Sequence, residues 1–304
     1  MRTFVGIDSG GTNTRCWVAD EERVLGRATC GTVKIMTVGE EVATERLQQL
    51  VRDAAADGGV DLAQVTRTCI GVAGISSGEV KRWSEATLRA VVGGEVLVVG
   101  DEDIALDAAF QGGPGVFLIA GTGAIMNGRC RDGRKFGAGG FGPVLGDEGS
   151  GGWIGIEGVR AGLRAIDRGE PTLLIDAVMK FWKLESRGAL IAMGNDRSRA
   201  PFAELTGVVA ECAANGDAAA AEVLRRAGVF LADDVLLVVK KMQDAGCVED
   251  DYLRLAYTGS AVGKIAPVRE AMVERLHEVV PAMQVATEEV NAVEGALWLA
   301  RQGS

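Results

Sequence analysis

The sequence contains a single histidine, His277, among 304 residues. Because imidazole is the commonest general base and the commonest metal ligand in proteins, this scarcity excludes a mechanism built on a histidine cluster. His277 lies in the helical pattern VREAMVERLHEVV, where a solvated helix face is the expected environment. Any chemistry must therefore use carboxylates, hydroxyl groups, backbone amides and metal ions.

Cysteine is also sparse, and the cysteines form no CxxC pair. Neither a zinc site nor a disulfide framework is expected from such spacing, and a reducing cytoplasm is the compartment that fits best. The six residues are Cys16, Cys30, Cys69, Cys130, Cys212 and Cys247.

Long apolar runs and basic clusters are both missing. No uninterrupted run is long enough to span a bilayer, and the start, MRTFVGIDSGG, enters a strand pattern without a signal-peptide core. The formal net charge is −10, from 32 basic and 42 acidic residues. We therefore expect neither a membrane nor a nucleic acid as a partner. A phosphate-bearing ligand stays compatible, since backbone N–H groups and a bound cation supply a local positive field.

The sequence is 47% apolar, which is enough for a large core in two lobes. A pattern of strand, Gly/Thr turn, strand, polar turn and strand occurs twice, beginning near residues 4 and 115. We interpret this as a weak internal duplication; the alternative is that two hairpins look alike because hairpins use glycine. The predicted fold is α/β with two related lobes, residues 1–114 plus 287–304 and residues 115–286.

Periodicity places the individual elements. Helical spacing covers residues 40–57, 80–92, 103–111 and 289–302. Strand patterns cover residues 4–8, 14–20, 24–30, 68–74, 95–101, 115–120, 125–130 and 135–140, and a further strand within 252–262 runs into a Gly-Ser turn.

Two glycine turns follow apolar strands and are candidates for phosphate binding. In the first, Asp8 precedes Ser9-Gly10-Gly11-Thr12; the second is Gly121-Thr122-Gly123. Glycine lets backbone N–H groups approach an anion closely, and threonine adds a hydroxyl donor. A strand-end carboxylate such as Asp8 suits a hydrated Mg²⁺ ion. Each turn alone is typical of a tight hairpin, but the pair favours a polyphosphate held between facing turns.

Other phosphate motifs do not fit. The sequence has no GxxxxGK[ST] loop, because GSAVGKI (259–265) has the wrong spacing and places Ile after the Lys. No GxGxxG opens a βα unit of the dinucleotide-binding kind.

Five segments occur in the order and spacing of a known group of kinases: FVGIDSGGTNTRCWVAD, GVFLIAGTGA, GGFGPVLGDEGSGGWIG, LAYTGSAV and AVEGALWLA. In these the chain resembles the N-acetylglucosamine and glucosamine kinases of the BadF/BadG/BcrA/BcrD-type ATPase family, within the superfamily of actin-like ATPases and sugar kinases. The resemblance covers essentially the whole chain. It implies a ribonuclease-H-like fold in each lobe, with ATP and a sugar in the interlobe cleft.

The resemblance also implies which residues contact the nucleotide. Phe202-Ala203 matches an adenosine-side position, although these residues also read as a plain helix start, and Thr258-Gly259-Ser260 matches an adenosine turn. The implied nucleotide-binding residues are Asp8, Gly10, Gly11, Thr12, Gly121, Thr122, Gly123, Ala203, Gly259 and Ser260, with Asp8 as the metal ligand.

Asp101 ends the strand EVLVVGD, at the edge where α/β sheets place ligands. By resemblance, Asp101 is the general base that takes a proton from the sugar hydroxyl. Glu102 and Asp103 are close in sequence, and we expect Asp103 to cap the following helix.

The segment GFGPVLGDEGSGGWI (140–154) combines glycines with two acids. By resemblance, Gly140, Phe141 and Gly142 line the sugar through backbone groups, and Asp147 accepts hydrogen bonds from sugar hydroxyls. Glu148 or Ser150 is expected to cap the next helix or to complement its positive end.

Some positions depart from the family pattern. Lys34 stands where N-acetylhexosamine kinases have a sugar-contacting Asn. Its charge would pair with an acidic sugar substituent and repel a protonated amine; alternatively the side chain points to solvent. Ala124 replaces a common Ser, and Gly100 replaces Asn or Thr before the base. These changes leave the phosphotransfer scheme intact and leave the identity of the sugar open.

We therefore predict an ATP-dependent kinase for an amino sugar such as N-acetylglucosamine or a relative, and a homodimer, because similar kinases are homodimers. One alternative is an ATPase activator of a reductive dehydratase, with Cys130 and Cys16 as candidate iron–sulfur ligands. A second is a non-catalytic sugar-binding regulator, although the chain begins within its first strand and shows no added DNA-binding segment.

Overall fold

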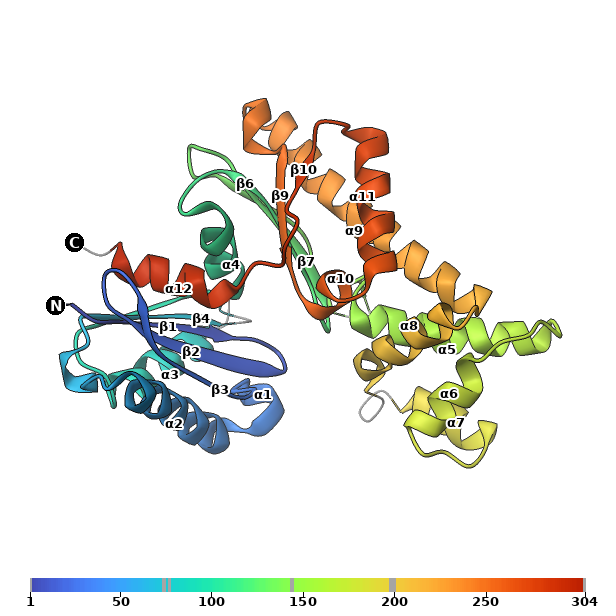
Figure 1. The fold of residues 1–304 in the computed structure, drawn as a ribbon, viewed down its shortest axis with the longest axis horizontal. Coiled ribbons are helices and arrows are strands. Elements are labelled where there is room, and N and C mark those ends of the chain that lie inside the picture. The colour runs from blue at the N-terminus through green and yellow to red at the C-terminus, as the bar shows by residue number, and fades with distance from the viewer. Residues whose placement is uncertain (1, 73–74, 76–77, 143–144, 197–200, 303–304) are drawn as a thin grey trace. The chain divides into compact units, whose positions relative to one another are not determined.

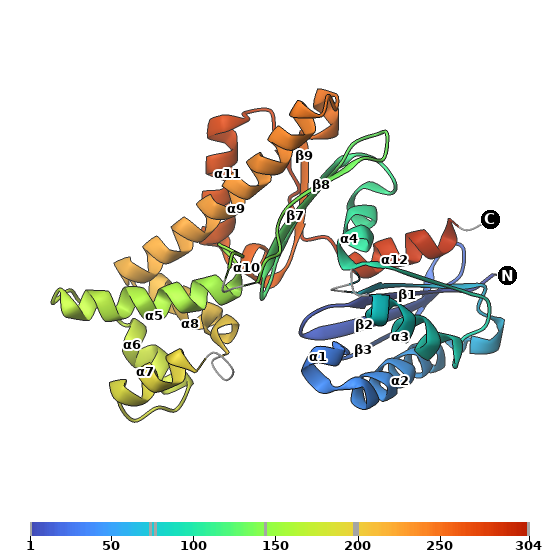
Figure 2. The same cartoon turned by 180° about the vertical axis from the view of Figure 1, so that it is seen from behind.

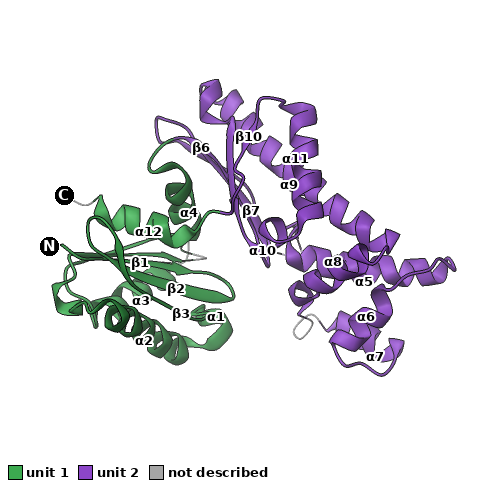
Figure 3. Ribbon diagram, in the orientation of Figure 1, with its two compact units in different colours: residues 1–113, 290–304 green, residues 114–289 purple. Residues whose placement is uncertain are grey.

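The computed structural model describes residues 2–302 except 73–74, 76–77, 143–144 and 197–200. The end of the predicted strand 68–74 and part of the glycine-rich segment 140–154 lie outside the described residues. The chain forms two compact units, residues 1–113 with 290–304 and residues 114–289 (Figure 3). These bounds lie close to those expected for the two lobes.

Unit 1 is built on a five-stranded sheet in the order β3-β2-β1-β4-β5. The meander β1 (Phe4–Ser9), β2 (Asn13–Ala19) and β3 (Val24–Gly31) is antiparallel. Strands β4 (Arg67–Val72) and β5 (Glu95–Gly100) run parallel to β1. The carboxyl ends of β1, β4 and β5 therefore meet at one edge of the sheet, where ligands of α/β proteins bind.

Helices cover both faces of this sheet (Figures 1 and 2). Helices α2 (Glu40–Gly58) and α3 (Gly78–Arg89) lie on one face, and α4 (Asp101–Phe110) and α12 (Ala292–Arg301) lie together on the other. Gly295 of α12 packs against the backbone of Ile104, so a side chain there would collide with α4. The short α1 (Ile35–Val38) follows β3, and a 3₁₀ turn covers Leu62–Gln64.

Unit 2 repeats the sheet, with the order β10-β9-β6-β7-β8. Its antiparallel meander is β6 (Gly115–Ala120), β7 (Ala124–Arg129) and β8 (Lys135–Gly139). Strands β9 (Arg254–Thr258) and β10 (Gln284–Val285) add in parallel beside β6. Each sheet thus has the same connectivity around its first strand, in agreement with the predicted internal duplication and α/β fold.

The remaining helices belong to unit 2 (Figure 1). The longest is α9 (Ala218–Asp244), which packs against β6–β8 and α11 (Ala266–Val279). No helix among the described residues has the length and apolarity that a membrane span requires. The others are α5 (Gly151–Asp167), α6 (Leu174–Phe181), α7 (Arg187–Asn195), α8 (Thr206–Ala214) and α10 (Ser260–Gly263), with 3₁₀ turns at Phe202–Leu205 and Glu249–Asp251.

Two local expectations were wrong. Asp103 does not cap α4, because β5 runs directly into the helix and Gly100 occupies the N-cap; Asp103 lies in the first turn with Asp101 and Glu102. Acidic residues there complement the positive helix end. The second error concerns the cysteines, since Cys130 and Cys247 form a disulfide. Their separation of 117 residues carries no local sequence signal.

Candidate active site

Two carboxylates meet at the carboxyl edge of the unit 1 sheet. Asp8 lies near the end of β1, opposite Arg15 on β2 and Gly71 on β4. Asp101 follows β5 directly as the first residue of α4. Burial raises the pKa of Asp8, and the charge of Arg15 opposes that rise. The structure therefore brings together the two acids that the sequence indicated as metal ligand and general base.

The pKa of Asp101 is raised to about 7. Burial is the main cause, and a hydrogen bond and the charge of Glu102 add to it, followed by the charge of Asp8. A carboxyl group that titrates near neutral pH is suited to accept a proton from a reacting hydroxyl.

Glu102 was not singled out from the sequence as a functional residue, yet its side chain shapes this edge. A Cβ atom at Gly100 would lie 2.5 Å from the Glu102 carboxylate. The missing side chain at position 100, noted above as a departure from the family pattern, thus leaves room for Glu102 to fold back beside Asp101.

The first glycine turn joins β1 to β2. The N–H of Gly10 donates to the carbonyl of Asn13 at 3.1 Å, while Gly11 and Thr12 are exposed. The hydroxyl of Thr32 donates to the carbonyl of Gly10 at 3.2 Å. The backbone N–H of Lys34 donates to that same hydroxyl at 3.1 Å. The loop that carries Lys34 is therefore fastened to the turn that follows Asp8.

Lys34 itself is exposed at the start of α1. Across the described residues its ammonium group makes no ion pair. Strand β3 runs in the same direction as β1, because both are antiparallel to β2. Lys34 therefore lies at the same edge of the sheet as Asp8, on the side away from Asp101.

The second glycine turn, Gly121–Gly123 in unit 2, is held by the first residues of α5. The N–H of Gly151 donates to the carbonyl of Gly121 at 2.7 Å, and that of Gly152 donates to the carbonyl of Thr122 at 3.1 Å. Ser150 caps the helix by accepting from the N–H of Trp153 at 3.2 Å, as one of the predicted alternatives required. The turn is thus fixed while the side chain of Thr122 stays exposed.

Asp147 connects this turn to the glycine-rich loop. It is buried and has a left-handed backbone with φ of 59°, a conformation that costs free energy for a non-glycine residue. Its Oδ1 accepts from the N–H of Gly142 at 3.0 Å. A Cβ atom at Gly123 would lie 2.5 Å from its Oδ2. Asp147 therefore braces two loops that were both predicted to contact ligands.

Gly140 and Gly142 have φ of 77° and 84°, which only glycine adopts readily. Phe141 between them is 70% exposed. The loop therefore exposes an aromatic ring between two glycines, and its backbone contact with a flat polar ligand stays a prediction.

The residues predicted on the adenosine side lie beside the second turn. Gly259, with φ of 107°, packs directly on Ala120 and Gly121. Ala203 lies in the 3₁₀ turn, and its carbonyl accepts from the hydroxyl of Thr206 at 2.8 Å. The same hydroxyl is 3.1 Å from the carbonyl of Gly151. Unit 2 thus gathers the second turn, Ala203 and Gly259-Ser260 around the start of α5.

Sequence reasoning missed two further acids in unit 2. Glu289 accepts from the hydroxyl of Thr258 at 2.9 Å and from the N–H of Gly259 at 2.8 Å, and so fixes the turn that was predicted on the adenosine side. Asp234 on α9 has a raised pKa, caused by burial and then by the charges of Glu148, Asp233 and Asp147. Neither residue belongs to a recognisable sequence motif, because partners of each lie far away in the sequence.

Comparison with known proteins identifies the family of the chain. The profile of the BadF/BadG/BcrA/BcrD ATPase family matches residues 5–300. The chain belongs to this family. It is 30% identical to an N-acetylmuramic acid/N-acetylglucosamine kinase of Clostridium acetobutylicum, over 99% of both chains. It is 28% identical to an N-acetyl-D-glucosamine kinase of Dictyostelium discoideum, over 98% of this chain and 97% of that one.

The fold of the family is shared as well. A solved structure from Chromobacterium violaceum, assigned provisionally as an N-acetylglucosamine kinase, superposes with a TM-score of 0.77 at 23% identity. The match covers 99% of each chain. The α/β fold with two related lobes, predicted from the repeated strand pattern, and the actin-like ATPase/sugar-kinase architecture that the family resemblance implied are therefore confirmed.

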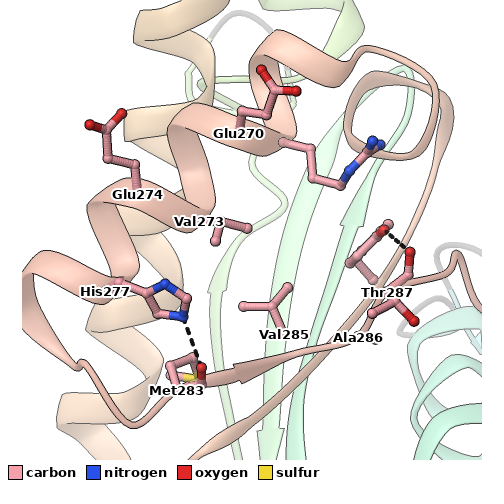
Figure 4. A pocket seen from close by; sticks show the side chains of 10 residues that line it. Glu270, Val273, Glu274, His277, Met283, Val285, Ala286 and Thr287 are labelled. Carbon is pink, nitrogen blue, oxygen red and sulfur yellow. Dashed lines mark hydrogen bonds between the residues drawn. The ribbon is translucent and has the colours of Figure 1, made fainter.

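A cavity of about 560 Å³ elsewhere in unit 2 contains none of the predicted site residues (Figure 4). It lies between α11 and the segment around β10, and Glu270, Glu274 and His277 of α11 face it. A ring nitrogen of the exposed His277 is 3.0 Å from the carbonyl of Met283. His277 thus lies on an exposed helix face, as expected.

Proposed function

We propose that this family member is an ATP-dependent sugar kinase that phosphorylates a hydroxyl of an amino sugar, with Asp101 as the general base. The observation that carries the proposal is the pairing of Asp8 and Asp101 at one sheet edge, with the pKa of Asp101 raised to about 7. The chain is a phosphotransferase in this scheme, as its characterised relatives are by name.

In the proposed reaction the Asp101 carboxylate takes the proton of the sugar hydroxyl as its oxygen attacks the γ-phosphorus of ATP. The bond to the bridging oxygen breaks, and ADP leaves. The fixed turn Gly121–Gly123 and the turn Ser9–Thr12 supply backbone N–H groups for the phosphates. Ala203, Gly259 and Ser260 form the adenosine side.

The residues at the unit 1 edge fit a magnesium ion. Mg²⁺ prefers carboxylate oxygens and water, and a cation beside Asp8 would offset the repulsion that helps to raise the pKa of Asp101. Asp8 would hold the ion, which when bound neutralises phosphate charge. Positioning of the hydroxyl and proton removal remain the task of Asp101.

For the sugar we propose contacts from Asp147 and from the backbone of Gly140, Phe141 and Gly142, with Lys34 beside an acidic substituent. N-acetylglucosamine and N-acetylmuramic acid are the first candidates, because both occur in the name of the Clostridium relative. Lys34 would disfavour a free amino sugar, whose protonated amine carries the same charge. A homodimer and a cytoplasmic location stay predictions.

The activator alternative finds no support at the cysteines. Cys16 is fully buried within β2, and Cys130 is bonded to Cys247. Neither sulfur is free to ligate an iron–sulfur cluster at a subunit surface. A non-catalytic sugar binder differs from a kinase only in turnover, so the assay below distinguishes the two.

The test is a coupled assay of ADP formation with N-acetylglucosamine, N-acetylmuramic acid, glucosamine, glucose and buffer alone. We expect sugar-dependent turnover with an N-acetylated sugar. Asp101→Asn should lower kcat by about 10²–10⁴-fold, whereas Asp103→Asn in the same helical turn should change it by less than about tenfold. Full activity of Asp101→Asn would refute the base assignment, and sugar binding without turnover would favour the regulator.

A further inference from the structure

The disulfide between Cys130 and Cys247 lies at the end of the unit 2 sheet that is opposite to the phosphate turn. Strand β7 begins directly after Gly121–Gly123 and ends at Arg129, and Cys130 follows. A strand of this length spans roughly 20 Å. Cys247 lies just after α9, with Cα atoms of the two cysteines 5.9 Å apart.

The two sulfurs are held together by contacts that do not depend on the bond. The Nη1 of Arg134 donates to the carbonyl of Ala245 at 2.7 Å. Arg131 donates to Asp251 through its backbone N–H at 3.1 Å and its Nε at 2.8 Å. The Asp251 carboxylate is 99% buried, so these bonds fix the 245–251 segment against the turn after β7. Both sulfurs therefore stay adjacent when the bond is open.

The surroundings of Cys247 differ from those of the other thiols. Its sulfur is 3.9 Å from the Nη2 of Arg134, which also pairs with Asp132 at 2.7 Å. A neighbouring guanidinium donates to a thiolate and stabilises it. It is half-buried, whereas Cys130 is buried. Burial raises the pKa of all four free cysteines, Cys16, Cys30, Cys69 and Cys212. Cys30 is half-buried as well, but burial raises the pKa of its thiol. We therefore take the Cys247 thiolate as the attacking group.

We propose that Cys130 and Cys247 form a reversible redox pair that exchanges with small-molecule disulfides of the glutathione class. The Cys247 thiolate attacks the glutathione disulfide, forms a mixed disulfide and releases one glutathione thiolate. The Cys130 thiol loses its proton to solvent, and its thiolate attacks the Cys247 sulfur and releases the second glutathione. The protein loses two electrons, and glutathione disulfide gains them.

A metal site is the competing use of these residues. The sulfurs and an Asp251 oxygen lie within 4.8 Å of one another, which suits a cation. Both oxygens of Asp251 are already bonded to Arg131, however, and Arg134 adds a second positive charge beside the sulfur. A divalent cation would have to displace one guanidinium and face another, so the arrangement favours thiol exchange.

The exchange is tested on the full chain, equilibrated with reduced and oxidised glutathione at several ratios, then acid-quenched, alkylated and weighed by mass spectrometry. We expect one two-electron transition. Cys130→Ser should stop at a stable glutathione adduct on Cys247, whereas Cys247→Ser should form no adduct. Cys212→Ser, which removes another buried thiol, should leave the transition unchanged.

Two further measurements separate exchange from a structural or metal role. Arg134→Gln should slow the exchange several-fold at pH 7, while Arg225→Gln, on an exposed ion pair, should not. The oxidised protein should melt a few degrees higher than the reduced one, with equal ATP turnover. The proposal would be overturned if the disulfide stayed oxidised at every glutathione ratio. It would also be overturned if the reduced protein retained stoichiometric zinc after dialysis against added Zn²⁺.

Discussion

Asp8 lies near the end of β1 and Asp101 directly follows β5, two strands separated in the sheet only by β4, and the charge of Asp8 contributes to the raised pKa of Asp101. Carboxylates that repel each other at a sheet edge are a familiar way to set the protonation state of one of them. The consequences are measurable in the pH dependence of both activity and stability.

The first prediction concerns activity. The free enzyme needs ionised Asp101, so kcat/KM should fall below the pKa of about 7, approaching tenfold per pH unit. Steady-state ADP formation between pH 5 and 9 measures this profile. The residual rate of Asp101→Asn should be independent of pH across the same range, and a wild-type profile that stays flat to pH 5 would contradict the assignment.

The second prediction concerns stability. The folded-state pKa of Asp101 lies above its ordinary value of 3.8, so the folded protein binds this proton more tightly than the unfolded chain does. Stability from this group is therefore present at low pH and is lost as pH rises toward and past 7. Asp101→Asn carries no such charge and should be more stable than wild type at pH 8, by roughly 2 kcal/mol.

Thermal melts of both proteins at pH 5 and pH 8 provide the measurement. The gap between variant and wild type should shrink at pH 5, since wild-type Asp101 is then protonated. Asp103→Asn is the matched control in the same turn. Equal melting temperatures at pH 8 would show that Asp101 is not held in an unfavourable charged state.

The third prediction concerns the adenosine side. Gly155 of α5 packs on the carbonyl of Phe202, and an added Cβ would collide with that backbone. Gly155→Ala should therefore displace Ala203, raise KM for ATP and lower stability by roughly 1–3 kcal/mol. Gly188→Ala, in α7 where nothing lies closer than 3.7 Å, is the control and should be neutral or slightly stabilising. An unchanged KM for ATP would show that the packing of Gly155 on Phe202 does not affect nucleotide binding.

Local signals explain what the sequence could predict. Each glycine turn follows a short apolar strand, and Asp101 follows another, so both the sheet and its functional edge could be inferred from neighbouring residues. The disulfide could not, because 117 residues separate its cysteines. The same limit applies to Glu289, which reaches Gly259 only through the parallel arrangement of β9 and β10.

Asp147 shows a subtler limit. The family motif identified Asp147 as a site residue. Its hydrogen bond to Gly142 and its contact with Gly123, however, depend on a left-handed backbone conformation that the amino-acid sequence does not specify. The hydrogen bond of Asp147 to Gly142 is a contact within the glycine-rich segment that composition alone does not predict. The motif thus located Asp147 in the sequence but did not predict its backbone conformation or its contacts.

The last prediction concerns the sugar. Lys34 is exposed, makes no ion pair with any described residue, and its loop is tied to the Gly10 turn through Thr32. If its ammonium pairs with a sugar carboxylate, Lys34→Met should lower kcat/KM for N-acetylmuramic acid by roughly 3–10-fold, the size of a partly exposed ion pair. The value for N-acetylglucosamine, which lacks the acid, should hardly change.

Lys240→Met is the matched control, since Lys240 is an exposed lysine on α9 whose ion-pair partner among the described residues is Asp244, one turn away. It should affect neither sugar. The loss caused by Lys34→Met should also diminish at high salt, because screening weakens an exposed pair. An equal loss for both sugars would mean that Lys34 stabilises the conformation of its loop. No loss for either sugar would mean that its side chain points to solvent. A loss confined to N-acetylmuramic acid would show that Lys34 recognises the carboxylate substituent.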